Sequence, residues 1–138
     1  MLDEQTPFGK HAATRLREEI IGWLTTVTPD GAPRPVPIWF LWDGGRSILL
    51  YSRPGKRKLD NIAANPNVSL NLDSDRVDAD IVVCWGEARV SDDPPAVQVP
   101  DYVAKYAERI AALGWTQEGF AADFSVPIRI DLTRIHGW

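Results

Sequence analysis

Four basic residues gather in one short segment of the chain: Arg53, Lys56, Arg57 and Lys58. The segment joins an expected strand at 47–52 to an expected helix at 56–64, so free backbone N–H groups and the positive end of the helix dipole reinforce the side-chain charges. Ser52 adds a hydroxyl donor, and Asn61 can face the same point because residues three and four apart share a helix face. This combination suits a phosphate group. From the residue types alone, a solvated basic turn is an equally good interpretation.

The stretch at 35–40, Pro-Val-Pro-Ile-Trp-Phe, is a second candidate. Pro33, Pro35 and Pro37 lack N–H groups, and these gaps fall on one edge of an extended strand because the N–H direction alternates along it. The aromatic and apolar side chains of this edge could form a flat slot for a planar ring. A sheet edge protected from aggregation by proline is the simpler interpretation of the same residues.

Side-chain catalysis finds little support in the sequence. The chain has two histidines, His11 and His136, one cysteine, Cys84, and no H-E-x-x-H, C-x-x-C or G-x-S-x-G arrangement. Cys84 lies in an apolar run without a basic neighbour, so we interpret it as a core residue. No metal site is expected, and no catalytic residue can be named. A cofactor that performs the difficult chemistry, oriented by the protein, is the natural alternative.

The tryptophan at position 138 is one of six in the chain. Packing in cores and at subunit interfaces explains most such residues. Trp138 differs because an aromatic side chain at the end of the sequence, beside His136 and Gly137, must pack on something or fray. It could cover a ring bound in a partner subunit, which makes it a candidate cofactor contact.

The candidate residues described above should be positioned mainly by short strands. Apolar alternation predicts strands at 22–27, 33–42, 47–52, 68–72, 80–90 and 126–132, with turns at 28–31 and 43–45. Gly86 marks the expected position of a bulge where a barrel bends. Six strands with hairpin-like turns and no G-x-G-x-x-G motif favour a mainly β fold, a six-stranded antiparallel barrel, over a doubly wound sheet.

Helical spacing of apolar residues predicts helices at 8–20, 56–64 and 100–113. The last of these helices should bury one apolar face, made of Val103, Ala107, Ile110 and Ala111. Its polar residues Lys105, Glu108 and Arg109 should point outward.

Length and composition limit the classes of protein. With 138 residues, 44% apolar and 25% charged, the chain fits one globular domain, which we place at 1–138. The longest apolar runs are far shorter than the ~20 residues of a membrane span, and no secretory pattern is found. The single cysteine also fits a reducing cytoplasm, where we expect the protein. The net charge of −4 argues against a general nucleic-acid binder, so any anion site must be local.

The order of motifs along nearly the whole chain resembles the pyridoxamine-5′-phosphate-oxidase-like split β-barrel superfamily. The segments that carry this resemblance are Gly22–Val27, Pro29–Pro33, Pro35–Phe40, Lys58–Ile62 and Asn65–Leu70. Within the superfamily the chain is most similar to the small actinobacterial branch of flavin- and deazaflavin-dependent oxidoreductases. That branch keeps a Lys-x-x-Asn-[Ile/Leu]-x-x-[Asn/Asp]-Pro helix, here 58–66, and often a Gly-Trp end, here 137–138.

The resemblance implies a six-stranded split barrel, a homodimer and two equivalent cofactor sites in clefts between subunits. It assigns the phosphate to the end of the third strand and the following helix, and carries over to Ser52, Lys58 and Asn61. The segment that lines the cofactor ring corresponds to Pro37, Ile38 and Trp39. Only proximity and charge place Arg53, Lys56 and Arg57 near the same anion.

Members of the superfamily use flavin mononucleotide (FMN), coenzyme F420 (a deazaflavin with a phosphate and a polyglutamate tail), or haem and other tetrapyrroles. We expect F420, because the branch resemblance points there and four basic residues could bind a phosphate plus tail carboxylates. FMN is the alternative. Vitamin B6 oxidation is not expected, because the C-terminal arginine motif for that substrate is missing.

The sequence therefore predicts an F420-dependent oxidoreductase that transfers a hydride to an unsaturated or quinone-like small molecule. Two other functions stay open. The chain could be a non-catalytic cofactor carrier, because no proton donor is identified near the slot. It could also bind haem, for which His11 or His136 would be needed.

Overall fold

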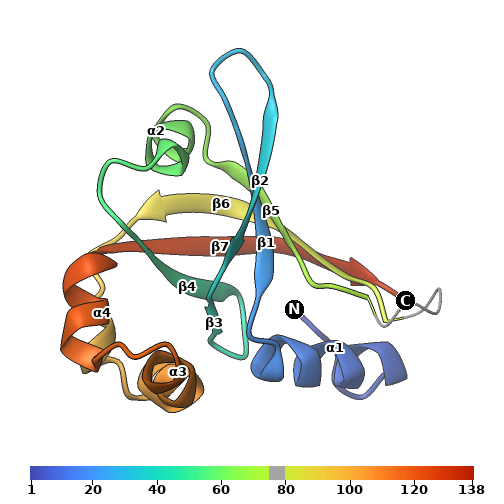
Figure 1. The fold of residues 1–138 in the computed structure, drawn as a ribbon. Coiled ribbons are helices and arrows are strands. Elements are labelled where there is room, and N and C mark those ends of the chain that lie inside the picture. Colours follow the sequence, from blue (N-terminus) through green and yellow to red (C-terminus); the bar gives the residue numbers. More distant parts are fainter. Residues whose placement is uncertain (75–79) are drawn as a thin grey trace.

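A computed structural model describes residues 1–74 and 80–138 of the chain (Figure 1). In these residues seven strands form one antiparallel sheet, in the order β2-β1-β5-β6-β7-β4-β3. The strands are β1 (Gly22–Val27), β2 (Pro33–Ile38), β3 (Leu41–Trp42), β4 (Ser47–Ser52), β5 (Asn67–Asn71), β6 (Val82–Val90) and β7 (Val126–Gly137). The helices are α1 (Pro7–Glu18), α2 (Arg57–Ala64), the 3₁₀ helix η1 (Ala96–Gln98), α3 (Pro100–Ala112) and α4 (Gln117–Asp123). None of these described helices has the length and apolar character that crossing a membrane requires.

The sheet has seven strands instead of the predicted six because the strand expected at 33–42 is broken at Trp39 and Phe40. The backbone of Phe40 bonds to α3: its N–H donates to the Tyr106 hydroxyl and its carbonyl accepts from Lys105 Nζ, both at 2.8 Å. β2 therefore pairs with β1, whereas β3 pairs with β4 at the opposite edge of the strand order. Two residues connect both edges, so the sheet must curl. The predicted mainly β, antiparallel split barrel is confirmed.

The main core fills the inside of the curled sheet. Burial alternates along β1 and β6, as expected for strands with one face on a core. Leu24, Leu70 and Ile130 are among the buried residues of this core, and α1 adds Ala12 and Leu16 to it. The period-two pattern in the sequence therefore located this core correctly.

The strand β4 is buried on both faces because a second layer covers its outer side. Ile48 and Leu50 belong to the main core, while Leu49 and Tyr51 pack in a second cluster with side chains of η1, α3 and α4. Figure 1 shows α3 and α4 beside β4, at the end of the molecule away from the C-terminus. This second layer forms one end of the site described below.

The buried face of α3 differs from the prediction. Its fully buried residues are Tyr102, Tyr106 and Ile110, so only Ile110 of the predicted face is among them. The two tyrosines mark this face because their rings pack on each other and on aromatic residues outside the helix. Lys105, predicted to point outward, is half-buried and bonds to the Phe40 carbonyl.

The ends of α1 and β7 also differ from the prediction, and one helix was not predicted. The helix α1 ends at Glu18, two residues before the predicted end, and β7 continues to Gly137, five residues beyond the predicted strand. The added part of β7 has no fully buried residue, so no apolar alternation marks it in the sequence. The helix α4 was not predicted, because its seven residues are too few for a clear period, although Thr116 caps it by accepting from the Gly119 N–H.

Two local predictions are confirmed. The register between β6 and β7 shifts between Trp85 and Gly86, which is the predicted bulge. A Cβ atom at position 86 would lie 2.5 Å from the carbonyl oxygen of Asp131, so the close approach of β7 requires glycine. The proline-rich strand β2 lies at an edge of the strand order, where a missing N–H interrupts no ladder.

Candidate functional site

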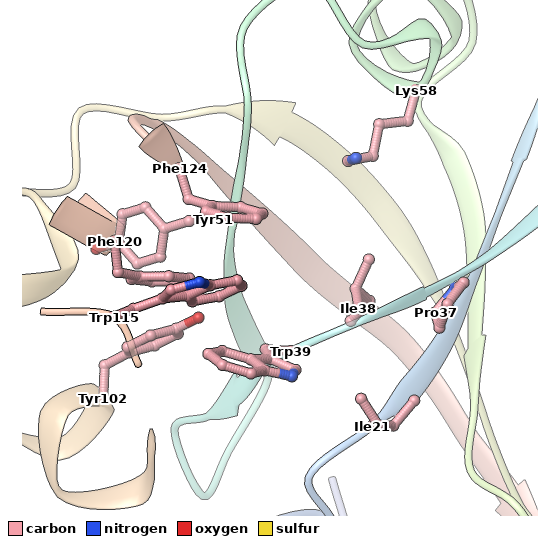
Figure 2. Close-up of a pocket in the computed structure, with 10 residues that line it drawn as sticks. All are labelled: Ile21, Pro37, Ile38, Trp39, Tyr51, Lys58, Tyr102, Trp115, Phe120 and Phe124. Atoms are coloured by element: carbon pink, nitrogen blue, oxygen red, sulfur yellow. The ribbon is translucent and has the colours of Figure 1, made fainter. Parts of the chain in front are cut away.

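A cavity of about 260 Å³ lies where β2, β4 and α2 meet the outer layer of α3 and α4 (Figure 2). Its walls are mostly aromatic or aliphatic. The lining residues are Ile21, Pro37, Ile38, Trp39, Tyr51, Lys58, Tyr102, Trp115, Phe120 and Phe124. Four of them, Pro37, Ile38, Trp39 and Lys58, are among the residues that the sequence predicted for a cofactor.

Lys58 is the cation of this cavity. It lies in the first turn of α2, and Figure 2 shows its side chain reaching into the space above Ile38. Among residues 1–74 and 80–138, neither a carboxylate nor a hydrogen-bond acceptor pairs with its ammonium. Burial, followed by the charge of Lys56, lowers the pKa of Lys58 from its ordinary value. An ammonium that is half-desolvated and unpaired is stabilised by an anionic ligand, so this position suits a phosphate.

The predicted slot lies where β2 ends. Pro37 and Ile38 are the last residues of β2, and Trp39 begins the break that leads to β3. The Trp39 ring stacks on Tyr106, with centroids 4.7 Å apart and planes at 10°, which holds the indole as a fixed wall. A planar ligand can therefore contact a rigid surface on this side.

Aromatic residues of the outer layer form a second, adjoining wall that was not predicted from the sequence. Phe120 and Phe124 of the α4 region stack at 4.7 Å, and Phe120 also stacks on Trp39 at 5.4 Å. Trp115 lies 6.3 Å from Trp39 and is 42% exposed, so it stands at the rim. The signal that could have located this wall was the spacing of Trp115, Phe120 and Phe124 around a Thr116 cap.

Three tyrosines of this region use their hydroxyl groups differently. The Tyr51 hydroxyl donates to the carbonyl of Pro94 at 2.6 Å, and that of Tyr106 donates to the carbonyl of Ile20 at 2.7 Å. Tyr102 is 1% exposed, and its hydroxyl has no hydrogen-bond partner in the part of the chain that the structure describes. Burial, followed by Tyr106 and Tyr51, raises the pKa of Tyr102, so this hydroxyl keeps its proton at neutral pH.

Two predicted phosphate ligands, Ser52 and Asn61, are buried and are not among the residues that line the cavity. Ser52 is fully buried, and its hydroxyl donates to the carbonyl of Arg53 at 2.9 Å. Asn61 is buried, and its amide donates to the Thr26 hydroxyl of β1 at 3.0 Å. The Ser52 bond lies at the end of β4, and the Asn61 bond attaches α2, the helix that carries Lys58, to the sheet.

The other basic residues of the segment lie outside this cavity. Arg53 lines a neighbouring cavity of about 160 Å³, which shares the walls of Trp115, Phe120 and Phe124. Its guanidinium lies over the Phe124 ring, 4.8 Å from the centroid. Lys56 and Arg57 are exposed at the start of α2. The segment therefore divides into one cation inside the cavity and three outside it.

Trp138 lies far from this cavity within one chain. It follows β7, whose 12 residues begin beside β4 and extend roughly 35 Å. Its backbone pairs with Ile81, and its ring is edge-on to His136 and 64% exposed. The idea that Trp138 covers a cofactor ring therefore requires a second copy of the chain.

The two histidines lie outside the cavity. His11 on α1 bonds to Asp80, and the His136 ring stacks on Trp85 of β6 at 5.9 Å. In the described residues no group of three histidine, cysteine, aspartate or glutamate side chains is arranged to hold a metal ion. The lining residues can thus bind an anion and a planar ring, and they contain neither a carboxylic acid nor an imidazole.

Known proteins share this architecture. General stress protein 26 from Bacillus anthracis is 20% identical, with 92% of this chain and 90% of that one covered and a TM-score of 0.69. An F420 reductase is 27% identical, with 89% and 94% covered and a TM-score of 0.63. HutZ, a heme storage protein from Vibrio cholerae, is 17% identical, with 90% of each chain covered and a TM-score of 0.62.

No curated protein matches the sequence. The similarity to the Bacillus and Vibrio proteins shows a common fold alone, since proteins with different ligands share it. The sequence model described as pyridoxamine 5′-phosphate oxidase matches residues 8–138, which include every strand of the barrel and every residue that lines the cavity. The chain therefore belongs to the pyridoxamine 5′-phosphate oxidase family.

Proposed function

We propose that the chain is an oxidoreductase that binds coenzyme F420 and transfers a hydride to an unsaturated or quinone-like small molecule. The observation that carries this proposal is the unpaired, half-buried ammonium of Lys58 at one end of a cavity with aromatic walls. Membership of the family and the 27% identity to an F420 reductase support it.

The residues present fit such a cofactor. Lys58 and the first-turn N–H groups of α2 would hold the phosphate, since no described side chain caps that end of the helix. The flat surface at 37–39 would line the ring. Arg53, Lys56 and Arg57, which lie outside the cavity, would meet the tail carboxylates.

Reduced F420 supplies a hydride when bound. The chain's own residues bind and orient: Lys58 fixes the anionic end, and the aromatic walls hold planar molecules face to face and exclude water. No carboxylic acid or imidazole lines the cavity in the described residues, and we propose that the proton that completes reduction of the acceptor comes from solvent, with Lys58 and Tyr102 acting in binding.

FMN is the second candidate, because it also carries a phosphate that Lys58 could bind. The two cofactors differ beyond the phosphate, since F420 has a polyglutamate tail and FMN ends there. We favour F420 because three cations outside the cavity would have no use with FMN. The resemblance of the chain also implies a homodimer.

Titration of the purified protein with F420 and with FMN, followed by fluorescence, tests this proposal. Lys58→Ala should weaken F420 binding roughly 10- to 100-fold, because a charge-assisted contact contributes about 1.5–3 kcal/mol. Lys10→Ala, which removes an exposed cation from α1, is the matched control and should bind as wild type does. Equal affinity of all three proteins for both cofactors would contradict the proposal. Light scattering on the same samples tests the homodimer.

The pH dependence gives a second measurement on the same variants. Only the protonated ammonium attracts phosphate, and the pKa of Lys58 is lowered. Affinity should therefore be full below that lowered pKa and fall as the pH rises through it. Lys58→Arg should extend binding to higher pH, because a guanidinium does not lose its proton there. A pH profile that is identical in the alanine variant would show that Lys58 does not contact the anion.

A further inference from the structure

We propose that Tyr102 is the polar anchor for the molecule that accepts the hydride: its hydroxyl donates a hydrogen bond to a carbonyl oxygen of a planar enone or quinone. The proposal rests on the proposed function, because it names the acceptor class of the same site. It starts from a hydroxyl that the fold places at the cavity and leaves without a partner.

The Tyr102 hydroxyl is free but not sealed from the cavity. In the described residues every polar side-chain atom that is fully buried has a hydrogen-bond partner. The Tyr102 oxygen has none, so it must reach open space, although 99% of the residue is covered. Figure 2 shows this oxygen pointing between Trp115 and Trp39 into the cavity. The neighbouring hydroxyls of Tyr51 and Tyr106 bond to backbone carbonyls instead.

Ring contacts on three sides hold Tyr102 in this direction. Tyr51 meets its ring edge-on at 5.1 Å and 84°, Tyr106 lies at 4.9 Å, and Phe120 stacks at 6.1 Å. The hydroxyl cannot turn far from the cavity without moving these rings, and their packing is worth about 0.5–1.5 kcal/mol per pair. A fixed donor costs little ordering when a ligand binds, which makes it suitable for positioning.

The chemistry of the surroundings selects the ligand class. Because the pKa of Tyr102 is raised, the hydroxyl is neutral and serves as a hydrogen-bond donor to a neutral oxygen. The walls around it, Trp39, Trp115 and Phe120, are flat and apolar, so they favour a planar conjugated molecule. Figure 2 places Lys58 at the other end of the cavity, so an anionic group and a carbonyl group are bound apart.

A pair of probes tests the proposal without any cofactor. Menadione and 2-methylnaphthalene share a planar bicyclic skeleton, and only menadione has carbonyl oxygens. Binding of each is measured from shifts of the tryptophan indole N–H signals in ¹⁵N-labelled protein. Tyr102→Phe, which removes the hydroxyl and keeps the ring, should weaken menadione binding about 3- to 10-fold, the effect of one net hydrogen bond. Binding of 2-methylnaphthalene should change less than about twofold.

Tyr106→Phe is the matched control, because it removes a neighbouring hydroxyl that does not line the cavity. This variant should lose thermal stability and keep the preference for menadione. The proposal is overturned if Tyr102→Phe weakens both probes equally, or neither, or if wild-type protein binds neither. If Tyr102→Phe does not fold, equal binding of the two probes to wild type overturns the proposal, and a preference for menadione supports it. If the protein does not bind F420 but still prefers menadione to 2-methylnaphthalene, the proposed cofactor is wrong and the proposed role of Tyr102 in binding a carbonyl group stands.

Discussion

The two ends of the cavity are built in different ways. At the Lys58 end, the polar groups come from one continuous segment, 52–58, and its helix start. At the Tyr102 end, the side chains come from the break after β2, from β4, α3 and α4, and from the loop between these helices, spread along the chain from Trp39 to Phe124. A local segment can place a charge, whereas an aromatic wall needs distant segments to fold against each other.

The two ends should also differ in how substitutions affect ligand affinity and the free energy of unfolding. Lys58 is unpaired and half-buried, so removing it leaves no partner group without a bond. The residues of the opposite end, Tyr102 and Phe120, are buried and stack on several rings. Removing the Lys58 ammonium should therefore change ligand affinity with little effect on stability, whereas truncating a stacked ring such as Phe120 should lower the free energy of unfolding.

The largest expected effect is on stability, at Phe120. Its ring is 4% exposed and stacks on Trp39 and Phe124, so Phe120→Ala leaves a hole in the second cluster. The free energy of unfolding should fall by about 3–5 kcal/mol. Urea denaturation followed by circular dichroism measures it. Lys58→Ala, studied in parallel, should stay within about 0.5 kcal/mol of wild type. A loss of similar size in the two variants would remove the distinction between the ends.

A smaller effect is expected where the Lys58 end is fastened to the barrel. Asn61→Ala leaves the buried Thr26 hydroxyl without its partner and should lower the free energy of unfolding by about 1–3 kcal/mol. Thr26→Val completes a double-mutant cycle, and the two substitutions should not add, because they remove one shared bond. F420 affinity in Asn61→Ala should fall less than in Lys58→Ala. A larger fall would make Asn61 a direct ligand, as the sequence predicted.

The Lys58 end of the cavity could be predicted from the sequence better than the Tyr102 end. The barrel strands and the basic segment could be predicted because apolar alternation and adjacent charges are local patterns. The Gly86 bulge could be predicted because an isolated glycine inside a strand pattern marks such a position. The resemblance to the family added the fold and the ring-lining residues Pro37, Ile38 and Trp39, which do line the cavity. It also named Ser52 and Asn61 as ligands, which stays a prediction; in the structure the Ser52 hydroxyl bonds to the Arg53 carbonyl and the Asn61 amide bonds to the Thr26 hydroxyl.

The aromatic end was not predicted, because helix periodicity assigned the wrong face to α3. Tyrosine counts as only moderately apolar, so Val103 and Ala107 defined the expected face, and Tyr102 and Tyr106 were left outside it. The break after Ile38 was missed for a related reason. Only the folded chain brings Lys105 and Tyr106 to the backbone of Phe40, and those bonds interrupt the strand.

The smallest expected effect concerns Arg53, which belongs to both ends. Its charge comes from the basic segment, but its guanidinium lies over Phe124 and lines the second cavity. If it binds the F420 tail, Arg53→Ala should weaken F420 binding about 2- to 5-fold, as for an exposed ion pair worth 0.2–1 kcal/mol, and leave FMN binding unchanged. Arg53→Lys keeps the charge and should keep most of the affinity at low salt. Equal weakening of both cofactors would place Arg53 at the phosphate with Lys58. If Arg53→Ala leaves F420 binding unchanged and weakens menadione binding, Arg53 belongs to the Tyr102 end of the cavity and not to the Lys58 end.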